Sequence, residues 1–360
     1  MIPPREIRAA GPGPDEERLR TAYLDLLKLS LCDLAGAGTR TISWTGDRRV
    51  FSRELSGDDQ LEWRAGGRDW PLNALTMVGL RRLDDLQACV ESVVGDGIDG
   101  DLIEAGAWRG GASILMRATL DSLGARERNV WVADSFQGFP APETEGDEDD
   151  RALEEEMNSA FDYLSAPLDV VKGHFARFGC ADGVEFVPGF FEETMPGLRG
   201  RRWSVIRLDG DTYKATRVTL EALYPGLAVG GYVVLDDYCF LPACRRAVDD
   251  FRRERGIGEP IEEIDWNGAR WRRESDAPVA VPADEEIARP VSRAGSPREA
   301  PERADGRIPT DRELELEDEL AALEARLREA EAEVERLRGT PLPRALDWAR
   351  RRAGRGARWG

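Results

Sequence analysis

The stretch Asp101-Leu-Ile-Glu-Ala-Gly-Ala-Trp-Arg-Gly-Gly-Ala-Ser113 runs from an apolar segment through three glycines into a segment with helical periodicity. The apolar segment predicts a buried strand, and the change of period after the glycines predicts the start of a helix. Gly106 permits a tight turn, whereas Gly110 and Gly111 let a ligand approach the backbone. Because the first N–H groups of a helix have no intrahelical partner, they can bind a carboxylate or phosphate. The stretch therefore predicts a loop that binds a nucleotide-type ligand.

The acids around this loop narrow the choice of ligand. The glycine order, Gly106 and then Gly110-Gly111, departs from G-x-G-x-x-G. Glu104, at the end of the strand, suits an ammonium or sulfonium ligand better than a pyrophosphate, and S-adenosylmethionine (SAM) carries both cations. Asp134 closes the next strand, where an acid can accept both ribose hydroxyls. The pattern favours a SAM site, and the alternative is a tight packing turn with a capping Asp.

Strand and helix patterns alternate through the middle of the chain. Strands are expected over residues 101–107, 130–133, 184–188, 203–208 and 231–235, and helices over residues 74–94, 112–123, 168–178, 215–223 and 243–255. Two further strand-like runs, 261–265 and 269–273, flank Trp266-Asn267-Gly268, and Asn-Gly in this setting is a strong hairpin signal. The alternation predicts an α/β fold with a doubly wound, mostly parallel, seven-stranded Rossmann-like sheet. Ligands of such sheets bind at the carboxyl ends of the strands.

Two neighbouring strands of this sheet end in paired acids. Asp209 and Asp211 follow one strand, and Asp236 and Asp237 follow the next. Carboxylates held together repel one another unless a cation neutralises them, and a hard divalent cation such as Mg²⁺ prefers oxygen ligands. A bound metal would lower the pKa of a coordinated hydroxyl, and either Asp209 or Asp211 could accept its proton. The alternative is a set of exposed acids on polar loops.

Composition excludes several classes of function. The net charge of −19 argues against a nucleic-acid partner, because phosphate binding relies on Lys and Arg. The five cysteines form no CxxC pair and predict neither a zinc site nor a disulfide framework. The N-terminus lacks a signal-peptide pattern, and no apolar run reaches about 18 residues. We therefore expect a cytoplasmic protein without a membrane span.

The chain divides into five parts by pattern. They are an N-terminal extension and loop-rich helical cap at 1–69, the α/β domain with the expected SAM site at 70–275, a disordered linker at 276–310, a coiled coil at 311–339 and an Arg/Trp-rich tail at 340–360. The coiled coil rests on leucines and other apolar residues spaced alternately by four and three, which favours a homo-oligomer over an isolated charged helix. The tail could contact an anionic membrane or an acidic partner, fold back on the acidic body or stay solvated.

Two other features favour structural roles. His174, the single histidine, lies on an expected helix far from any strand end, so a structural role is favoured over a catalytic base. The acidic run Gly146-Asp-Glu-Asp-Asp150 favours a solvated lid over a second metal site.

Several motifs in order resemble one enzyme family. They are Trp70-Pro71, Thr76-Met77-Val-Gly79, Arg82-Leu-Asp-Asp85, the glycine loop, Val132-Ala-Asp-Ser-Phe-Gln-Gly-Phe-Pro140, Val187-Pro-Gly-Phe-Phe191, Leu208-Asp-Gly-Asp-Thr-Tyr213 and Gly230-Gly-Tyr-Val-Val-Leu-Asp-Asp-Tyr238. Over roughly residues 70 to 273 the chain resembles the macrocin O-methyltransferase family, which methylates deoxysugars on antibiotics with SAM and Mg²⁺. The resemblance implies a class I SAM-dependent methyltransferase fold.

The resemblance also implies roles for individual residues. Asp209, Asp236 and Asp237 match the metal ligands, and Asp209 matches the proposed catalytic base. The SAM site is expected to contain Thr76, Met77, Glu104, Gly106, Gly110, Ser113, Asp134, Ser135, Gly189 and Asp209. One departure lies beside the metal ligands, where the family's usual Tyr-Glu-Ser-Thr reads Tyr213-Lys-Ala-Thr216.

These patterns predict an O-methyltransferase that acts on a sugar hydroxyl of a glycosylated natural product. One alternative is methylation of a surface polysaccharide or glycolipid by an enzyme tethered through its coiled coil and basic tail. Another is a non-catalytic methyltransferase-fold scaffold, which the intact acids Glu104, Asp134, Asp209, Asp236 and Asp237 disfavour. The glycine spacing disfavours a nicotinamide-dependent oxidoreductase.

Overall fold

The computed structural model describes residues 13–36, 38–44, 50–55, 57–140, 148–159 and 161–275. All of them belong to Met1–Ala283, the first of the two units into which the chain divides. The linker, coiled coil and tail expected at 276–360 lie outside the described residues and stay predictions. Among the described helices, none has the length and apolar character needed to cross a bilayer.

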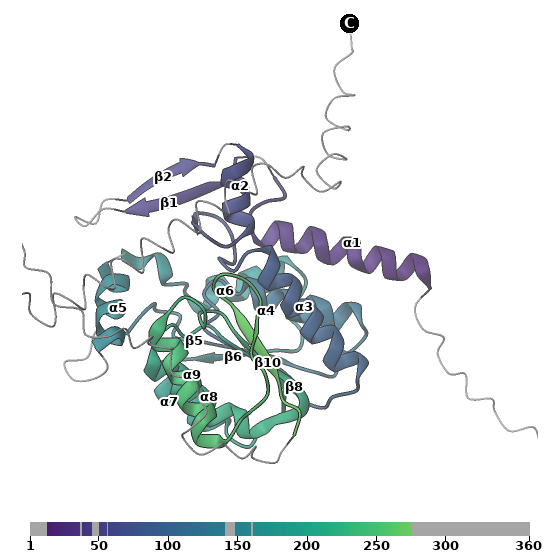
Figure 1. Cartoon of the computed structure of the whole chain (residues 1–360). Helices are drawn as coiled ribbons and strands as arrows, with labels where there is room; N and C mark the ends of the chain where they lie inside the picture. The colour runs from purple at the N-terminus through teal and green to yellow at the C-terminus, as the bar shows by residue number, and fades with distance from the viewer. Residues whose placement is uncertain are drawn as a thin grey trace, which may run out of the picture. The chain divides into compact units, whose positions relative to one another are not determined.

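A seven-stranded sheet forms the centre of the domain (Figure 1). Its strand order is β6-β5-β4-β7-β8-β10-β9, in which β4 to β8 pair in parallel and β10 pairs antiparallel with β8 and β9. The strands are β4 (Asp101–Ala105), β5 (Val130–Asp134), β6 (Val184–Pro188), β7 (Trp203–Leu208), β8 (Leu227–Leu235), β9 (Glu262–Glu263) and β10 (Ala269–Arg272). The expected doubly wound sheet and its late hairpin are confirmed.

Alternation along the strands builds a core on each face of the sheet. Leu102 and Val205 belong to one buried cluster, and their neighbours Ile103 and Ile206 belong to the other. Successive strand residues point to opposite faces, so each apolar strand supplies both cores. The first cluster includes residues of α1 (Pro14–Leu31), α3 (Leu80–Gly95), α4 (Gly111–Ser122) and α6 (Leu168–Arg177). The second includes residues of η2 (Met195–Leu198), α8 (Tyr213–Leu223), η3 (Tyr224–Gly226) and α9 (Pro242–Arg255), with α7 (Phe191–Thr194) packed beside them.

The N-terminal region contains a small sheet that the sequence reading missed. Residues 36 to 68 were expected to be loop-rich. Instead, β1 (Arg40–Trp44) pairs antiparallel with β2 (Val50–Glu54) and with β3 (Trp70–Pro71). The helix α2 (Asp58–Ala65) lies between β2 and β3 in the chain. Arg64, which is buried, donates to Asp69 and to the carbonyl of Arg40. The region is thus organised by a buried charge and backbone pairing instead of an apolar periodicity, which is why the pattern was weak.

The segment before α3 is an irregular loop with several bends, so the helix expected to start at Ala74 begins instead at Leu80, after Gly79. The reason lies in the contacts of residues 72 to 75. Arg109 donates to the carbonyls of Leu72 and Ala74, each at 2.9 Å. Gly111 N donates to the carbonyl of Leu75 at 2.9 Å. These contacts hold the segment along the glycine loop.

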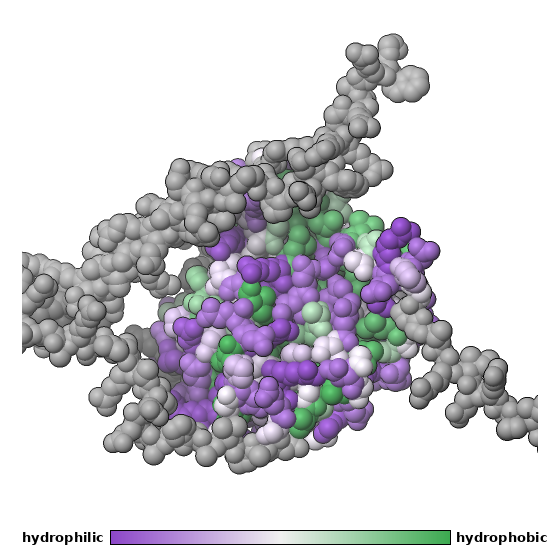
Figure 2. Space-filling model, turned by 45° about the vertical axis from the view of Figure 1, so that its right-hand side comes forward, coloured by the Kyte–Doolittle hydropathy of each residue, from purple (hydrophilic) through white to green (hydrophobic). Residues whose placement is uncertain are grey.

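The view in Figure 2 shows mostly hydrophilic residues on one face, with hydrophobic residues scattered among them. Exposed large hydrophobic side chains of the described region include Leu19 and Leu26 of α1 and Phe240 after β8. Scattered apolar residues of this kind are ordinary on protein surfaces.

Candidate active site

The glycine loop brings the ends of β4 and β7 into contact. Gly106 has φ of +92°, and a Cβ at this position would lie 1.7 Å from the carbonyl oxygen of Asp209. Asp209 N donates to the carbonyl of Ala105 at 2.8 Å. Any side chain at Gly106 would therefore push the two strand ends apart. The glycine was predicted for a tight turn, and the structure adds that it allows the close approach of Asp209.

Glu104 is fully enclosed and its two oxygens are both used by the protein. Arg207 Nη1 donates to Oε1 at 2.7 Å, and Ser113 Oγ donates to Oε2. Burial raises the pKa of Glu104 to about 7, and Arg207 and Ser113 oppose that rise. Because Ser113 lies near the start of α4, the Glu104 carboxylate holds the end of the glycine loop in place.

Asp134 clamps two loops with its side chain. Its Oδ2 accepts the N–H groups of Ala107 and Trp108, each at 2.9 Å, and its Oδ1 accepts Phe136 N at 2.7 Å. Burial raises the pKa of Asp134, and these backbone hydrogen bonds oppose that rise. The next residue, Ser135, closes a turn by donating to the carbonyl of Gly138 at 2.7 Å.

A pocket opens at the carboxyl ends of the strands. Five expected residues line it: Met77, Gly106, Asp134, Ser135 and Asp209. Asp211, predicted as an alternative proton acceptor, also lines it, and lining residues that were not predicted include Trp108, Phe139, Glu154, Leu164, Phe190, Phe191 and Thr212.

The other expected cofactor residues support the lining instead of forming it. Thr76 Oγ1 accepts Val78 N at 3.2 Å, Ser113 holds Glu104, and Gly189 N donates to the carbonyl of Asp134 at 3.0 Å. Gly110 starts α4 in the left-handed conformation, where a Cβ would meet the ring of Phe175.

Backbone strain concentrates around the pocket. Among the described residues, four that are not glycine have positive φ: Asp33, Trp108, Phe136 and Asp211. Trp108 and Asp211 line the pocket, and Phe136 follows directly after Asp134 and Ser135, which also line it. Left-handed backbone is unfavourable for such residues and persists where surrounding contacts enforce it, commonly at functional sites.

Three carboxylates meet beside this pocket. One oxygen each from Asp209, Asp211 and Asp237 lies within 4.8 Å of the other two. Burial raises the pKa of all three, and repulsion from neighbouring carboxylates, which include Asp236, raises each pKa further. Asp237 Oδ2 is buried and has no hydrogen-bond partner in the described region. Clustered carboxylates with an oxygen to spare fit a hard divalent cation.

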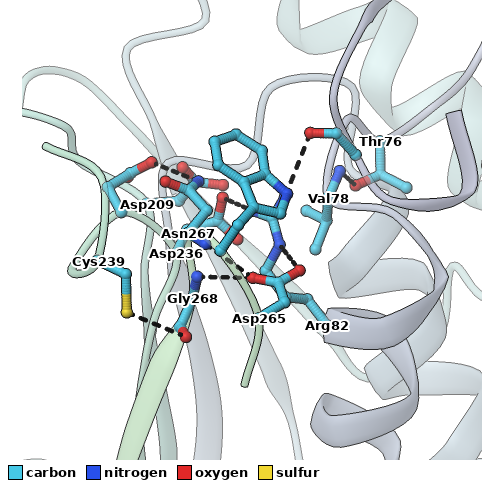
Figure 3. A network of polar contacts seen from close by, with 12 residues as sticks. Thr76, Val78, Arg82, Asp209, Asp236, Cys239, Asp265, Asn267 and Gly268 are labelled. Atoms are coloured by element: carbon cyan, nitrogen blue, oxygen red, sulfur yellow. Dashed lines mark hydrogen bonds and ion pairs between the residues drawn. The ribbon is translucent and has the colours of Figure 1, made fainter. Parts of the chain in front are cut away.

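Asp236, the neighbour of Asp237, has a different environment. Arg82 Nη1 pairs with its Oδ2, and Arg207 Nη2 pairs with its Oδ1 at 2.5 Å (Figure 3). Arg207 also donates to Asp209 Oδ2 at 2.9 Å. The structure therefore brings Asp209 and Asp237 together as expected, adds Asp211, and holds Asp236 beside them between two guanidinium groups.

The comparisons identify the family to which this site belongs. A family model described as Macrocin-O-methyltransferase (TylF) matches residues 21–273. The chain belongs to the macrocin-O-methyltransferase family. The resemblance read from the motifs is confirmed, and the protein is an O-methyltransferase.

Relatives within the macrocin-O-methyltransferase family match most of their own length. The 8-demethyl-8-(2,3-dimethoxy-alpha-L-rhamnosyl)-tetracenomycin-C 4'-O-methyltransferase of Streptomyces olivaceus is 46% identical over 259 residues, which are 71% of this chain and 94% of the relative. Mycinamicin III 3''-O-methyltransferase of Micromonospora griseorubida is 42% identical over 257 residues, 70% of this chain and 96% of the relative. The solved structure of the O-methyltransferase NovP has a TM-score of 0.63 and 37% identity, covering 71% of this chain and 100% of NovP.

Two features of this family member lie outside the cluster. His174 is buried on α6, and its Nδ1 lies 3.0 Å from the carbonyl oxygen of Arg109, so it contacts the backbone of the glycine loop.

Asp150, at the end of the acidic run, was expected to be solvated, but it is buried in α5 (Glu148–Ser159). Its oxygens accept the N–H groups of Tyr213 and Lys214 at 2.6 and 2.9 Å. For this residue the solvated-lid expectation was wrong, because the free N–H groups at the start of α8 need an acceptor.

Proposed function

We propose that this enzyme transfers the methyl group of SAM to a sugar hydroxyl of a glycosylated natural product, with Mg²⁺ as a second cofactor. The observation that carries the proposal is that Asp209 and Asp211 belong both to the pocket at the carboxyl ends of the strands and to the carboxylate cluster. A methyl donor and a cation-held hydroxyl would then share one crevice. The relative named for a rhamnosyl-tetracenomycin supports the substrate class.

The pocket has the chemistry expected of a SAM site. SAM supplies an activated methyl group when bound. Trp108, Phe190 and Phe191 offer aromatic surface, and Asp134 offers a carboxylate at the end of β5. The backbone hydrogen bonds to Asp134 keep this carboxylate and both neighbouring loops in one arrangement, which favours binding by preorganisation.

The carboxylate cluster has the chemistry expected of a Mg²⁺ site. Mg²⁺ supplies positive charge when bound, which lowers the pKa of a neighbouring hydroxyl. Asp209 and Asp237 would hold it, with Asp211 as the third carboxylate on the basis of proximity. The family resemblance instead gives Asp236 as the third ligand, and the pairing of Asp236 with Arg82 and Arg207 is what favours Asp211.

Asp209 is the proposed base that accepts the proton of the sugar hydroxyl, and Asp211 is the alternative. Arg207 fixes one oxygen of Asp209, so its carboxylate has a defined direction. Methyl transfer is an in-line displacement, and it depends mainly on the alignment of the two reacting groups. Rigid placement of Asp209 at the edge of the pocket contributes to that alignment.

Titration calorimetry with SAM, in Mg²⁺ and in EDTA, tests the proposal. Wild type and Asp237→Asn are both expected to bind SAM, whereas only wild type binds Mg²⁺ tightly. Screening of rhamnosylated and other deoxysugar glycosides with labelled SAM then identifies the acceptor. Absence of SAM binding to wild type would reject the methyltransferase reaction for this protein and favour a non-catalytic scaffold.

The rest of the proposal concerns the C-terminal region and the cell. We propose homo-oligomer formation through residues 311–339 and a cytoplasmic location. Methylation of a surface glycan by a tethered enzyme is the alternative, and binding of the full chain to anionic vesicles, lost on deletion of residues 341–360, would favour it.

A further inference from the structure

The turn between β9 and β10 is built on one side chain. Asp265 Oδ1 accepts Asn267 N at 3.0 Å and Gly268 N at 2.9 Å. An Asp side chain that accepts from the backbone two and three residues later fixes a turn. The local contacts of Asp265 therefore help to fix the position of Asn267.

Three tertiary contacts then fix this turn against the rest of the domain, and Figure 3 shows the one between Arg82 and Asp265. Arg82 Nε donates to Asp265 Oδ2 at 3.2 Å, and Trp266 Nε1 donates to the carbonyl of Gly66 at 2.9 Å. Cys239 N, from the segment after β8, donates to the carbonyl of Asn267 at 2.9 Å. The turn is thus tied to α3, to the N-terminal region and to the segment that carries Asp237.

The Asn267 amide lies on the carboxylate cluster. The residue is only 6% exposed, and its Nδ2 donates to Asp237 Oδ1 at 3.2 Å. Within the described part of the chain, Asp237 Oδ2 and Asn267 Oδ1 are both buried without a hydrogen-bond partner. Two such oxygens on either side of one hydrogen bond are costly unless a cation, or water held by it, satisfies them.

The neutrality of Asn267 matters as much as its hydrogen bond. Arg82 and Arg207 pair with both oxygens of Asp236, whereas the neutral amide binds one oxygen of Asp237 and leaves its charge available. A cationic partner in this place would compete with a metal ion. An amide donor fixes one carboxylate oxygen and leaves the other for a ligand.

We propose that Asn267 is a positioning residue that orients Asp237 for a divalent cation. This inference rests on the proposed function, because it needs the cluster to bind Mg²⁺. Outer contacts of this kind typically change metal affinity by about 10- to 100-fold. The alternative is that the amide only fills the space beneath the hairpin.

Calorimetric titration of Mg²⁺ alone into the full-length protein tests this inference. Asn267→Leu, which keeps the shape and removes the donor, is expected to bind Mg²⁺ about 10- to 100-fold more weakly. Asn267→Ser, which keeps a donor on a shorter side chain, should fall between it and wild type and remains informative if the Leu variant does not fold. SAM affinity in EDTA should be unchanged, and excess Mg²⁺ should restore methyl transfer.

The control is Asn129→Leu, because Asn129 directly precedes β5 at the amino-terminal end of the strands, and the site lies at their carboxyl ends. It should bind Mg²⁺ as wild type does. Equal Mg²⁺ affinity in wild type and both Asn267 variants overturns the role of Asn267 and leaves the proposed function standing. A wild type that binds SAM but no Mg²⁺ overturns the metal centre, and the role of Asn267 with it.

Discussion

Asp236 and Asp237 are adjacent in the chain and have opposite electrostatic environments. Asp236 lies between two buried arginines, and each of its oxygens has a cationic partner. Asp237 faces Asp209 and Asp211, and the one hydrogen-bond partner of its carboxylate among the described residues is the neutral amide of Asn267. One Asp-Asp pair directly after β8 thus contributes to two regions.

The difference separates a supporting region from a region with unused binding capacity. Arg207 joins Glu104, Asp209 and Asp236, which follow or lie on three adjacent strands of the sheet. In that region each acid has a guanidinium partner. In the Asp209–Asp211–Asp237 cluster, Asp211 and Asp237 have no such partner among the ion pairs of the described residues, and carboxylates of this kind can bind a cation.

Removal of Arg207 should have the largest effect. Arg207→Met leaves three acids without their shared cation, and loss of one partner of a buried ion pair costs about 3–5 kcal/mol of unfolding free energy. Urea denaturation monitored by tryptophan fluorescence measures it. Arg246→Met, which removes a half-exposed partner of Asp149, is the control and should cost about 0–1 kcal/mol. Equal losses would show that the buried network does not support the fold.

Substitution of single acids tests the division between the two regions. Asp237→Asn and Asp211→Asn should weaken Mg²⁺ binding by more than the about 10- to 100-fold expected of an outer contact. Asp236→Asn should mainly lower the unfolding free energy, because an amide cannot balance Arg82 and Arg207. Mg²⁺ titration calorimetry and urea denaturation give the two quantities for each variant. If Asp236→Asn loses Mg²⁺ binding while Asp211→Asn keeps it, the third ligand is Asp236, as the family resemblance implies.

Local sequence patterns predicted the elements of this site better than their contacts. The sheet, the glycine loop and the paired acids follow from apolar periodicity and from the position of polar residues at strand ends. The role of Arg207 was missed. An Arg within the apolar run Val205-Ile-Arg-Leu208 does indicate a buried ion pair, because a buried arginine in a strand needs partners. Its partners come from three strands, so only the assembled sheet names them.

The missed contacts share one physical cause, which is large separation along the chain. Asn267 meets Asp237 across 30 residues, and Arg82 meets Asp236 across 154. The hairpin at Asn267 was predicted from its turn residues, but a turn signal says nothing about what the amide contacts. The small N-terminal sheet was missed for another reason, because its short strands contain polar residues such as Arg40 and Arg53 and give a weak apolar pattern.

The carboxylate cluster should make stability depend on pH and metal together. Folding raises the pKa of Asp209 from 3.8 to about 6 and that of Asp211 from 3.8 to about 8, chiefly through burial. Their contribution to the free energy of unfolding is therefore fully present below pH 3.8 and lost as the pH rises through the folded values. Mg²⁺ binds the deprotonated acids, so the increase in Tm on adding Mg²⁺ should be larger at pH 8.5 than at pH 5.5. An increase independent of pH would place Mg²⁺ away from these acids.

Asp150 extends the comparison to a third type of environment and should give the smallest effect. Its carboxylate accepts the backbone N–H groups of Tyr213 and Lys214. Asp150→Ala should cost about 1 kcal/mol of unfolding free energy, as loss of a helix cap does, whereas Asp150→Asn keeps an acceptor and should cost a few tenths. Urea denaturation measures both losses, and calorimetry should show unchanged Mg²⁺ affinity in both variants. If the Asn variant loses as much stability as the Ala variant, the charge of Asp150 matters beyond its hydrogen bonds. If Mg²⁺ affinity falls as well, the cation site extends to α5, because a carboxylate that only caps α8 has no reason to change cation binding.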